Sequence, residues 1–216
     1  MTVIAIDGPA GAGKSSVARG VAAALSYSYL DTGALYRAMA LAVLEEGISP
    51  EDEGAVGAVA SQVEVSVRGD RTILNGRDVG DRIRDEDVTL IVSLISSYPA
   101  VRHRLLQLQK EMLRGGDIVI EGRDIGTKVA PGADLKIYLT ATLEQRATRR
   151  AGQTGAEGSD QLSGVKRDLE SRDRADAGRR ESPLAQAADS IVIDSSSLSL
   201  DEVVKQILAL ARGRNS

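Results

Sequence analysis

Short runs of consecutive apolar residues alternate along the chain with longer, more polar stretches. Apolar runs without polar alternation are typical of parallel strands that are buried on both faces. Helix boundaries are marked by Pro99 in a first turn, by Gly115-Gly116 at a stop, and by Thr142 and Ser199 as N-caps. The predicted strands are 3–7, 29–31, 117–121, 135–141 and 190–194. The predicted helices are 15–25, 34–45, 99–114, one from Thr142, one ending near 177 and one from Ser199.

Two stretches break this alternation. Residues 63–67 alternate apolar and polar positions, and turn residues follow at 69–70 and 75–76, which predicts a small antiparallel meander inserted into the main fold. Residues 152–164 are rich in Gly and Ser, which predicts a mobile segment. Together the elements predict an α/β fold with a five-stranded parallel sheet covered by helices on both faces. Such sheets bind ligands beyond the carboxyl ends of their strands.

Composition narrows the class of protein. The 216 residues suit one α/β domain, and the chain contains no Cys for disulfides or thiolate metal sites. No secretory signal and no run of about 20 apolar residues is visible, so we expect a cytoplasmic protein with no membrane partner. The net charge of −4 and the 2% aromatic content disfavour nucleic acid as a partner.

One motif matches a phosphate-binding pattern in full: G-x-x-x-x-G-K-S at residues 8–15, between a predicted strand and a predicted helix. Its glycines allow backbone N–H groups to surround a phosphate, at the positive end of the helix dipole. The lysine is expected to reach the β- and γ-phosphates, and the Ser15 hydroxyl to ligate Mg²⁺. We therefore predict that ATP or GTP binds here. The predicted contacts are Gly8, Pro9, Ala10, Gly11, Ala12, Gly13, Lys14, Ser15 and Ser16.

Arginines indicate what receives the phosphoryl group. The chain has 21 Arg and 6 Lys, and Arg123 follows a predicted strand at the edge expected to bind ligand. No N-K-x-D motif for reading a guanine base occurs. The single His, His103, is expected to be exposed, so the chain offers no obvious base for an alcohol acceptor. An acceptor that is itself a phosphate is already anionic and needs no base, so it fits this chain better than an alcohol does. An alcohol acceptor stays open as an alternative, because Asp31 or Asp124 could serve as its base.

Several motifs occur in the order found in one family: DGPAGAGKSS, LDTGALYR, IRDEDV, SSYPAVR, IEGRDIGT, SRDRADAGRRESPL and IDSSSLSLDEV. Over essentially its whole length the chain resembles the bacterial cytidylate kinases, which belong to the P-loop nucleoside monophosphate kinases. The resemblance implies a three-layer P-loop kinase core at 1–38, 89–148 and 166–216. It further implies a lobe that binds the nucleoside monophosphate (NMP) at 39–88, carrying the β insert, and a short lid at 149–165.

The resemblance also implies the activity, which is transfer of the γ-phosphoryl group of ATP to CMP or dCMP with Mg²⁺. The implied catalytic residues are Lys14, Arg123, Arg172 and Arg179, with Arg149 added to the donor site. The implied acceptor residues are Thr32, Tyr36, Arg37, Ser93, Arg102, Arg123, Asp124, Arg172, Asp176 and Arg179. We expect nucleotides as the partners and a monomer in solution. Alternatives are a kinase for UMP, AMP or an alcohol, and a regulatory nucleotide-binding protein without turnover.

Overall fold

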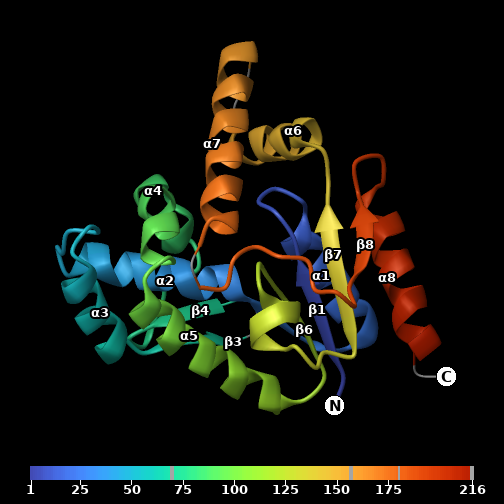
Figure 1. Ribbon diagram of the computed structural model, residues 1–216, viewed down its shortest axis with the longest axis horizontal. Helices are drawn as coiled ribbons and strands as arrows, with labels where there is room; N and C mark the ends of the chain where they lie inside the picture. The colour runs from blue at the N-terminus through green and yellow to red at the C-terminus, as the bar shows by residue number, and fades with distance from the viewer. Residues whose placement is uncertain (69–70, 156–157, 180, 215–216) are drawn as a thin grey trace. The chain divides into compact units, whose positions relative to one another are not determined.

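The computed structural model describes residues 1–68, 71–155, 158–179 and 181–214, which form two compact units. The first unit is Met1–Ser28 with Gly116–Ser216, and the second is Tyr29–Gly115. Figure 1 shows the helices and strands of each unit, coloured along the chain. The predicted division into core, NMP-binding lobe and lid follows other boundaries and stays a prediction. No helix within the described ranges is long and apolar enough to cross a membrane.

The main sheet is parallel and has five strands in the order β2-β6-β1-β7-β8, which confirms the predicted α/β class. Every residue of the central strands β1 and β6 is buried, as continuous apolar runs predict. β8 lies at the edge and alternates buried with exposed residues. The strands are β1 (Val3–Asp7), β2 (Ser28–Asp31), β6 (Ile118–Gly122), β7 (Leu135–Thr140) and β8 (Ile191–Asp194).

The register of the sheet places the chemically important turns at one edge. Asp7, the last residue of β1, lies opposite Gly122 on β6 and Tyr138 on β7. The glycine loop follows β1, and Arg123 follows β6 directly. Because the strands are parallel, these turns lie together at their carboxyl ends, where the predicted ligand site was expected.

The described residues of the first unit form four α-helices. α1 (Lys14–Leu25) packs against α8 (Leu200–Arg214), and α6 (Leu143–Thr154) pairs with α7 (Ser159–Ala177). Figure 1 shows α6 continuing from the carboxyl end of β7. Both predicted N-caps are confirmed: the Thr142 hydroxyl accepts the Gln145 N–H at 3.3 Å, and the Ser199 hydroxyl accepts the Glu202 N–H at 3.3 Å.

The sequence predicted a mobile segment over 152–164, and most of that range is helical. α6 continues to Thr154 and α7 begins at Ser159, while residues 156–157 lie outside the described part. The reason is packing: Leu162 and Val165 of α7 pack against a small core formed by Ala10, Ala147 and Leu169. This apolar stripe outweighs the low helix propensity of the glycine at 164. The segment between β6 and β7 contains one turn of π-helix, η3 (Ile125–Val129).

The second unit contains the antiparallel meander, which is confirmed. Its strands pair in the order β3-β4-β5, and Asn75 and Gly76 form the second turn with positive φ of 47° and 80°. The predicted turn at 69–70 lies outside the described residues. The strands are β3 (Val65–Arg68), β4 (Arg71–Leu74) and β5 (Arg77–Asp78).

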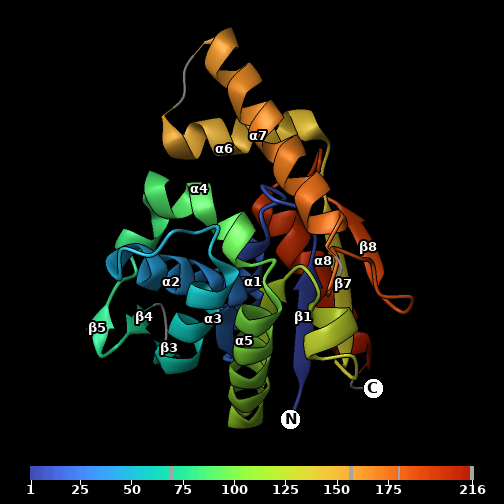
Figure 2. The same cartoon turned by 60° about the vertical axis from the view of Figure 1, so that its left-hand side comes forward.

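Helices lie beside the meander in this unit, and β5 lies at its outer edge (Figure 2). α2 (Thr32–Glu45) contacts β3 and β4, and α5 (Pro99–Met112) contacts α3 (Glu53–Gln62). α4 (Glu86–Ile95) contacts α2, and single 3₁₀ turns lie at η1 (Arg82–Arg84) and η2 (Leu113–Gly115). The sequence reading predicted neither α3 nor α4. α3 is rich in Ala and Gly and has a narrow apolar stripe, and it begins where Asp52 accepts the Ala55 N–H at 2.9 Å.

Candidate functional site

The loop between β1 and α1 has the backbone that a phosphate site requires. Gly13 has a φ of 91° and caps α1, so the first turn of that helix opens directly from the loop. Gly8 has a φ of 151°, and a Cβ at this position would lie 2.0 Å from the carbonyl oxygen of Leu139. Any side chain at residue 8 would therefore collide with the backbone of β7. Gly8 is therefore required because a side chain would clash, and Gly13 is required because its positive φ disfavours other residues.

Lys14 is buried at the end of this loop, with only 6% of its surface exposed. Its ammonium donates a hydrogen bond to the Pro9 carbonyl oxygen at 2.8 Å, across the base of the loop. Burial lowers the pKa of Lys14 to about 7, and the positive charge of Arg123 acts in the same direction. The nearby carboxylates Glu121, Asp7 and Asp176 act in the opposite direction. A bound anion would restore the full charge of this lysine.

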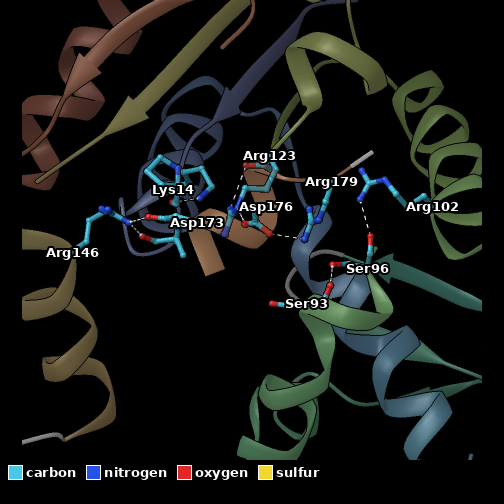
Figure 3. Close-up of polar contacts among 12 residues, drawn as sticks. Lys14, Ser93, Ser96, Arg102, Arg123, Arg146, Asp173, Asp176 and Arg179 are labelled. Atoms are coloured by element: carbon cyan, nitrogen blue, oxygen red, sulfur yellow. Dashed lines mark hydrogen bonds and ion pairs between the residues drawn. The ribbon is translucent and has the colours of Figure 1, made fainter. Parts of the chain in front are cut away.

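Asp176 of α7 joins two of the predicted arginines. Its carboxylate accepts a hydrogen bond from Arg123 Nε at 2.7 Å and another from Arg179 at 2.5 Å (Figure 3). Burial alone would raise the pKa of Asp176, but the two guanidinium groups lower it below its usual range. Burial likewise opposes the charge of Arg123, but the nearby carboxylates, with Asp176 the largest contributor, more than offset this, so the pKa of Arg123 is raised. The cluster of Asp176 with Arg123 and Arg179 is therefore fully ionised and carries a net positive charge.

Arg172 lies one helical turn before Asp176 and is half-buried. Burial lowers its pKa, and repulsion from Arg123 lowers it further. Within the described ranges it takes part in no hydrogen bond or ion pair, in contrast to Arg123 and Arg179. The nearby carboxylates Asp176 and Asp173 offset only part of this lowering of the pKa, so Arg172 carries a partly compensated cation, as expected of a group that binds an anion.

The arginines of α6 lie in two environments, and they are Arg146, Arg149 and Arg150. Arg149 donates to the carbonyl oxygens of Ala12 at 3.3 Å and of Ser195 at 2.6 Å, which places it against the glycine loop. Arg146 also contacts this loop, through the Ala10 carbonyl oxygen at 3.0 Å. Arg150 donates instead to Gln153 of its own helix. Arg149, which was expected to belong to the donor site, therefore lies beside the glycine loop.

Asp7 is a buried carboxylate that binds backbone rather than a cation. Its two oxygens accept the N–H groups of Ile125 at 2.8 Å and of Gly126 at 2.7 Å. Burial raises the pKa of Asp7 to about 6, although these hydrogen bonds act in the opposite direction. The pair of bonds fixes the start of η3, next to Arg123 and Asp124. Asp124 is itself buried, with 6% of its surface exposed.

The second unit brings together three of the other predicted residues. The guanidinium of Arg102, which is buried, lies 5.4 Å from the centre of the Tyr36 ring and donates to the Ser96 carbonyl oxygen at 3.0 Å. The Ser96 hydroxyl in turn donates to the carbonyl oxygen of Ser93 at 3.0 Å (Figure 3). Elsewhere in this unit Arg37 donates to Thr89 at 2.9 Å. Thr32 is buried in the first turn of α2.

The predicted site residues therefore form two sets. The first unit holds the glycine loop with Lys14, Ser15 and Ser16, followed by Arg123, Asp124, Arg149, Arg172, Asp176 and Arg179. The second unit holds Thr32, Tyr36, Arg37, Ser93 and Arg102. Sequence reasoning missed Asp173, Ser195, Ser96 and Asp7 as functional neighbours. Only Asp7 carried a signal, because it is a charged residue at the end of the otherwise apolar strand that leads into the glycine loop.

The chemistry of the loop fits Mg²⁺ bound together with a nucleotide. The Ser15 hydroxyl is half-buried in the first turn of α1, one residue after Lys14. Among the described residues no group of three or more His, Cys, Asp or Glu is arranged to hold a metal. Magnesium commonly takes one or two protein oxygens and fills its other positions with water and phosphate. Ser15 fits such a ligand.

The glycine loop, the parallel sheet and the arginines at its carboxyl edge define a P-loop kinase. Two solved structures share this fold: an uncharacterised protein from Eubacterium ventriosum (TM-score 0.56, 12% identity, 98% of each chain covered), and shikimate kinase from Acinetobacter baumannii (TM-score 0.51, 15% identity, 99% of this chain and 94% of that one). These identities are too low to indicate a substrate.

Comparison with protein families is more specific. The profile described as cytidylate kinase matches residues 4–213. The cytidylate kinase of Mycolicibacterium paratuberculosis is 51% identical over 219 residues, covering 99% of this chain and 96% of that protein. The cytidylate kinase of Halalkalibacterium halodurans is 44% identical, covering 98% of this chain and 97% of that protein. The chain belongs to the cytidylate kinase family.

Proposed function

We propose that the protein transfers the γ-phosphoryl group of ATP to CMP or dCMP, giving ADP and CDP or dCDP. The observation that carries this proposal is the identity of about half the residues, over nearly the whole chain, with a curated cytidylate kinase. The geometry of the first unit supports it, because a buried lysine and several arginines gather at the edge that holds the glycine loop.

The donor half of the reaction uses the glycine loop. The backbone N–H groups of the loop and the positive end of α1 bind the β-phosphate of ATP. Lys14 binds the β- and γ-phosphates, and its lowered pKa rises again when the anion binds. Ser15 would hold Mg²⁺, which neutralises charge on the donor phosphates when bound. Arg149 supports the loop through Ala12.

The acceptor half is assigned to residues of both units. Ser93, Asp124 and Arg102 are proposed to bind the cytosine ring, and Thr32, Tyr36 and Arg37 to border the same nucleotide. Arg102 is suited to this role because Tyr36 and the Ser96 carbonyl oxygen already orient its guanidinium. Pre-ordered polar groups discriminate well between bases, because a wrong base leaves them buried and unpaired.

Charge neutralisation supplies the catalysis. Arg123 uses Nε for Asp176, which leaves terminal N–H groups for the acceptor phosphate. Arg172 and Arg179 are proposed to span the donor and acceptor phosphates, and Asp176 to bind the sugar hydroxyls. The acceptor phosphate is already an anion, so no side chain has to remove a proton. Alignment of the two nucleotides and preorganised positive charge account for the rate.

An acceptor screen tests the proposal. ADP release from ATP and Mg²⁺ is measured with CMP, dCMP, UMP and AMP in turn, with Lys14→Met as the inactive control. We expect CMP and dCMP to be the preferred acceptors. Equal or better rates with UMP or AMP contradict the substrate assignment, and tight ATP binding without acceptor-dependent ADP release indicates a regulatory protein instead. The cytoplasmic location and the monomeric state stay predictions.

A further inference from the structure

One residue of the glycine loop is held on both sides of its backbone. The N–H of Ala10 donates to the Asp173 carboxylate at 3.2 Å, and the carbonyl oxygen of Ala10 accepts from Arg146 at 3.0 Å. The same Arg146 nitrogen also donates to Asp173 at 2.5 Å, which closes the triangle (Figure 3). Asp173 belongs to α7 and Arg146 to α6, so the pair joins the loop to both helices.

The triangle is well shielded from water. The side chain of Arg146 is 10% exposed and that of Asp173 is 22% exposed. Arg146 makes a third contact through Nε, which donates to the Ala141 carbonyl oxygen at 3.1 Å, so its guanidinium is fixed in both position and orientation. Beside it the Ala10 methyl group lies in the small core with Ala147 of α6 and Leu169 of α7. Backbone, charge and packing thus act on the same loop residue.

This arrangement has one consequence for the phosphate site. The Ala10 N–H is committed to Asp173 and does not turn toward a phosphate, so the loop offers a defined subset of its donors.

We propose that Arg146 and Asp173 are positioning residues that hold the glycine loop in its ATP-binding conformation. The proposal rests on the proposed function in taking ATP as the donor. Neither side chain is required to touch a nucleotide. The pair acts through the Ala10 peptide, and its effect falls on the donor nucleotide more than on the acceptor.

The chain contains a matched control for this proposal. Lys166 of α7 also forms an ion pair with Glu144 of α6, so it bridges the same two helices. That pair is more exposed, at 31% and 72%, and its described contacts do not include the glycine loop. If an ion pair between α6 and α7 merely fastens the hairpin, removing either pair has the same result. If the loop is the target, only the Arg146–Asp173 pair affects ATP.

The test compares Asp173→Asn with Glu144→Gln in the full-length protein. The dissociation constant for ATP with Mg²⁺ is measured by calorimetry without acceptor, so this readout does not depend on which acceptor the enzyme uses. We expect Asp173→Asn to weaken ATP binding about tenfold, as expected when a buried charged hydrogen bond is lost, and Glu144→Gln to leave it within twofold. In kinetics, the KM for ATP rises and the KM for CMP stays within twofold.

Hydrogen exchange of peptides covering residues 4–16 gives a readout independent of turnover. Faster exchange in Asp173→Asn than in Glu144→Gln supports the proposal, and Arg146→Lys provides a second variant if Asp173→Asn does not fold. Equal effects of the two pairs on ATP binding, or equal rises in the KM for ATP and for CMP, overturn it. A wild-type enzyme that binds ATP but does not phosphorylate CMP contradicts the proposed function and leaves this comparison intact.

Discussion

The arginines proposed to bind the acceptor are held by different means in the two units. In the first unit, the Asp176 carboxylate holds Arg123 and Arg179. In the second unit, the described hydrogen bonds of Arg102 and Arg37 go to carbonyl and hydroxyl oxygens. A carboxylate orients a guanidinium and offsets part of its charge, whereas a neutral oxygen orients it and leaves the charge. This difference matches the proposed roles, because the first unit must manage several cations near each other.

The largest expected effect concerns the carboxylate-held arginines. Arg123→Ala removes a cation from the acceptor phosphate and leaves buried Asp176 with fewer donors. We expect the transition state to lose about 4 kcal/mol of stabilisation, which steady-state kcat/KM with CMP measures. Arg123→Lys keeps the positive charge but not the paired N–H groups of the guanidinium, so it should lose less of this transition-state stabilisation. Unchanged turnover in Arg123→Ala removes this arginine from the mechanism.

Asp7 differs from Asp176 within the first unit, because its buried carboxylate binds backbone N–H groups and not guanidinium groups. Its pKa of about 6 in the folded protein exceeds its ordinary value of 3.8, so the native state binds the proton more tightly than the unfolded chain. The stability contributed by this protonation is complete below the ordinary pKa and is lost as the pH rises through about 6. The loss amounts to about 3 kcal/mol at neutral pH.

Urea unfolding of wild type and Asp7→Asn at several pH values measures this contribution. Asparagine does not titrate, so wild type should lose stability relative to the variant as the pH rises, mostly between pH 4 and 6. Asparagine can accept only one of the two N–H groups, which adds a difference that does not depend on pH. A difference between the two proteins that stays constant over this range contradicts the raised pKa of Asp7.

In the second unit, Arg102→Met removes the cation beside Tyr36 and the hydrogen bond to the Ser96 carbonyl oxygen. If this arginine helps to bind cytosine, the KM for CMP should rise about thirtyfold, equivalent to about 2 kcal/mol. The KM for ATP should change little, because the predicted donor contacts lie in the first unit. His103→Ala, at an exposed position of the same helix, is the control. Equal changes in both KM values contradict the assignment.

The smallest expected effect is on the stability contributed by Arg172. This arginine is desolvated and repelled by Arg123, so Arg172→Gln should leave the free energy of unfolding unchanged or raise it by up to about 1 kcal/mol. Activity should fall in the same variant, because its cation is proposed to bind phosphate. Thermal unfolding and turnover of Arg172→Gln measure both quantities. A large loss of stability would place Arg172 among the structural arginines instead.

Features formed by residues that are close together in the chain were predictable from sequence. The glycine loop, the strand before it and the helix after it are adjacent in the chain, so their spacing alone defines a phosphate site. The meander and both N-caps followed from turn and cap residues in the same way. Arg123 was predicted as a site residue because it follows a buried strand directly.

Contacts between distant residues were not predictable. Arg146 reaches Ala10 across 136 positions, and Asp173 reaches the same residue across 163. Nothing in the spacing of these residues distinguishes them from exposed charges on a helix. α3 escaped prediction for a different reason: its many Ala and Gly residues leave the apolar periodicity weak, and packing decides the helix.

Transfer of a labelled phosphoryl group tests directly whether the protein phosphorylates CMP from ATP. The enzyme is incubated with ATP labelled in the γ-phosphate, Mg²⁺ and CMP, and the labelled products are separated. The account predicts that the label appears in CDP, in a one-to-one ratio with the ADP formed, and that Lys14→Met abolishes the transfer. Label that appears in inorganic phosphate without CDP, or that enters UMP or AMP in preference to CMP and dCMP, contradicts it.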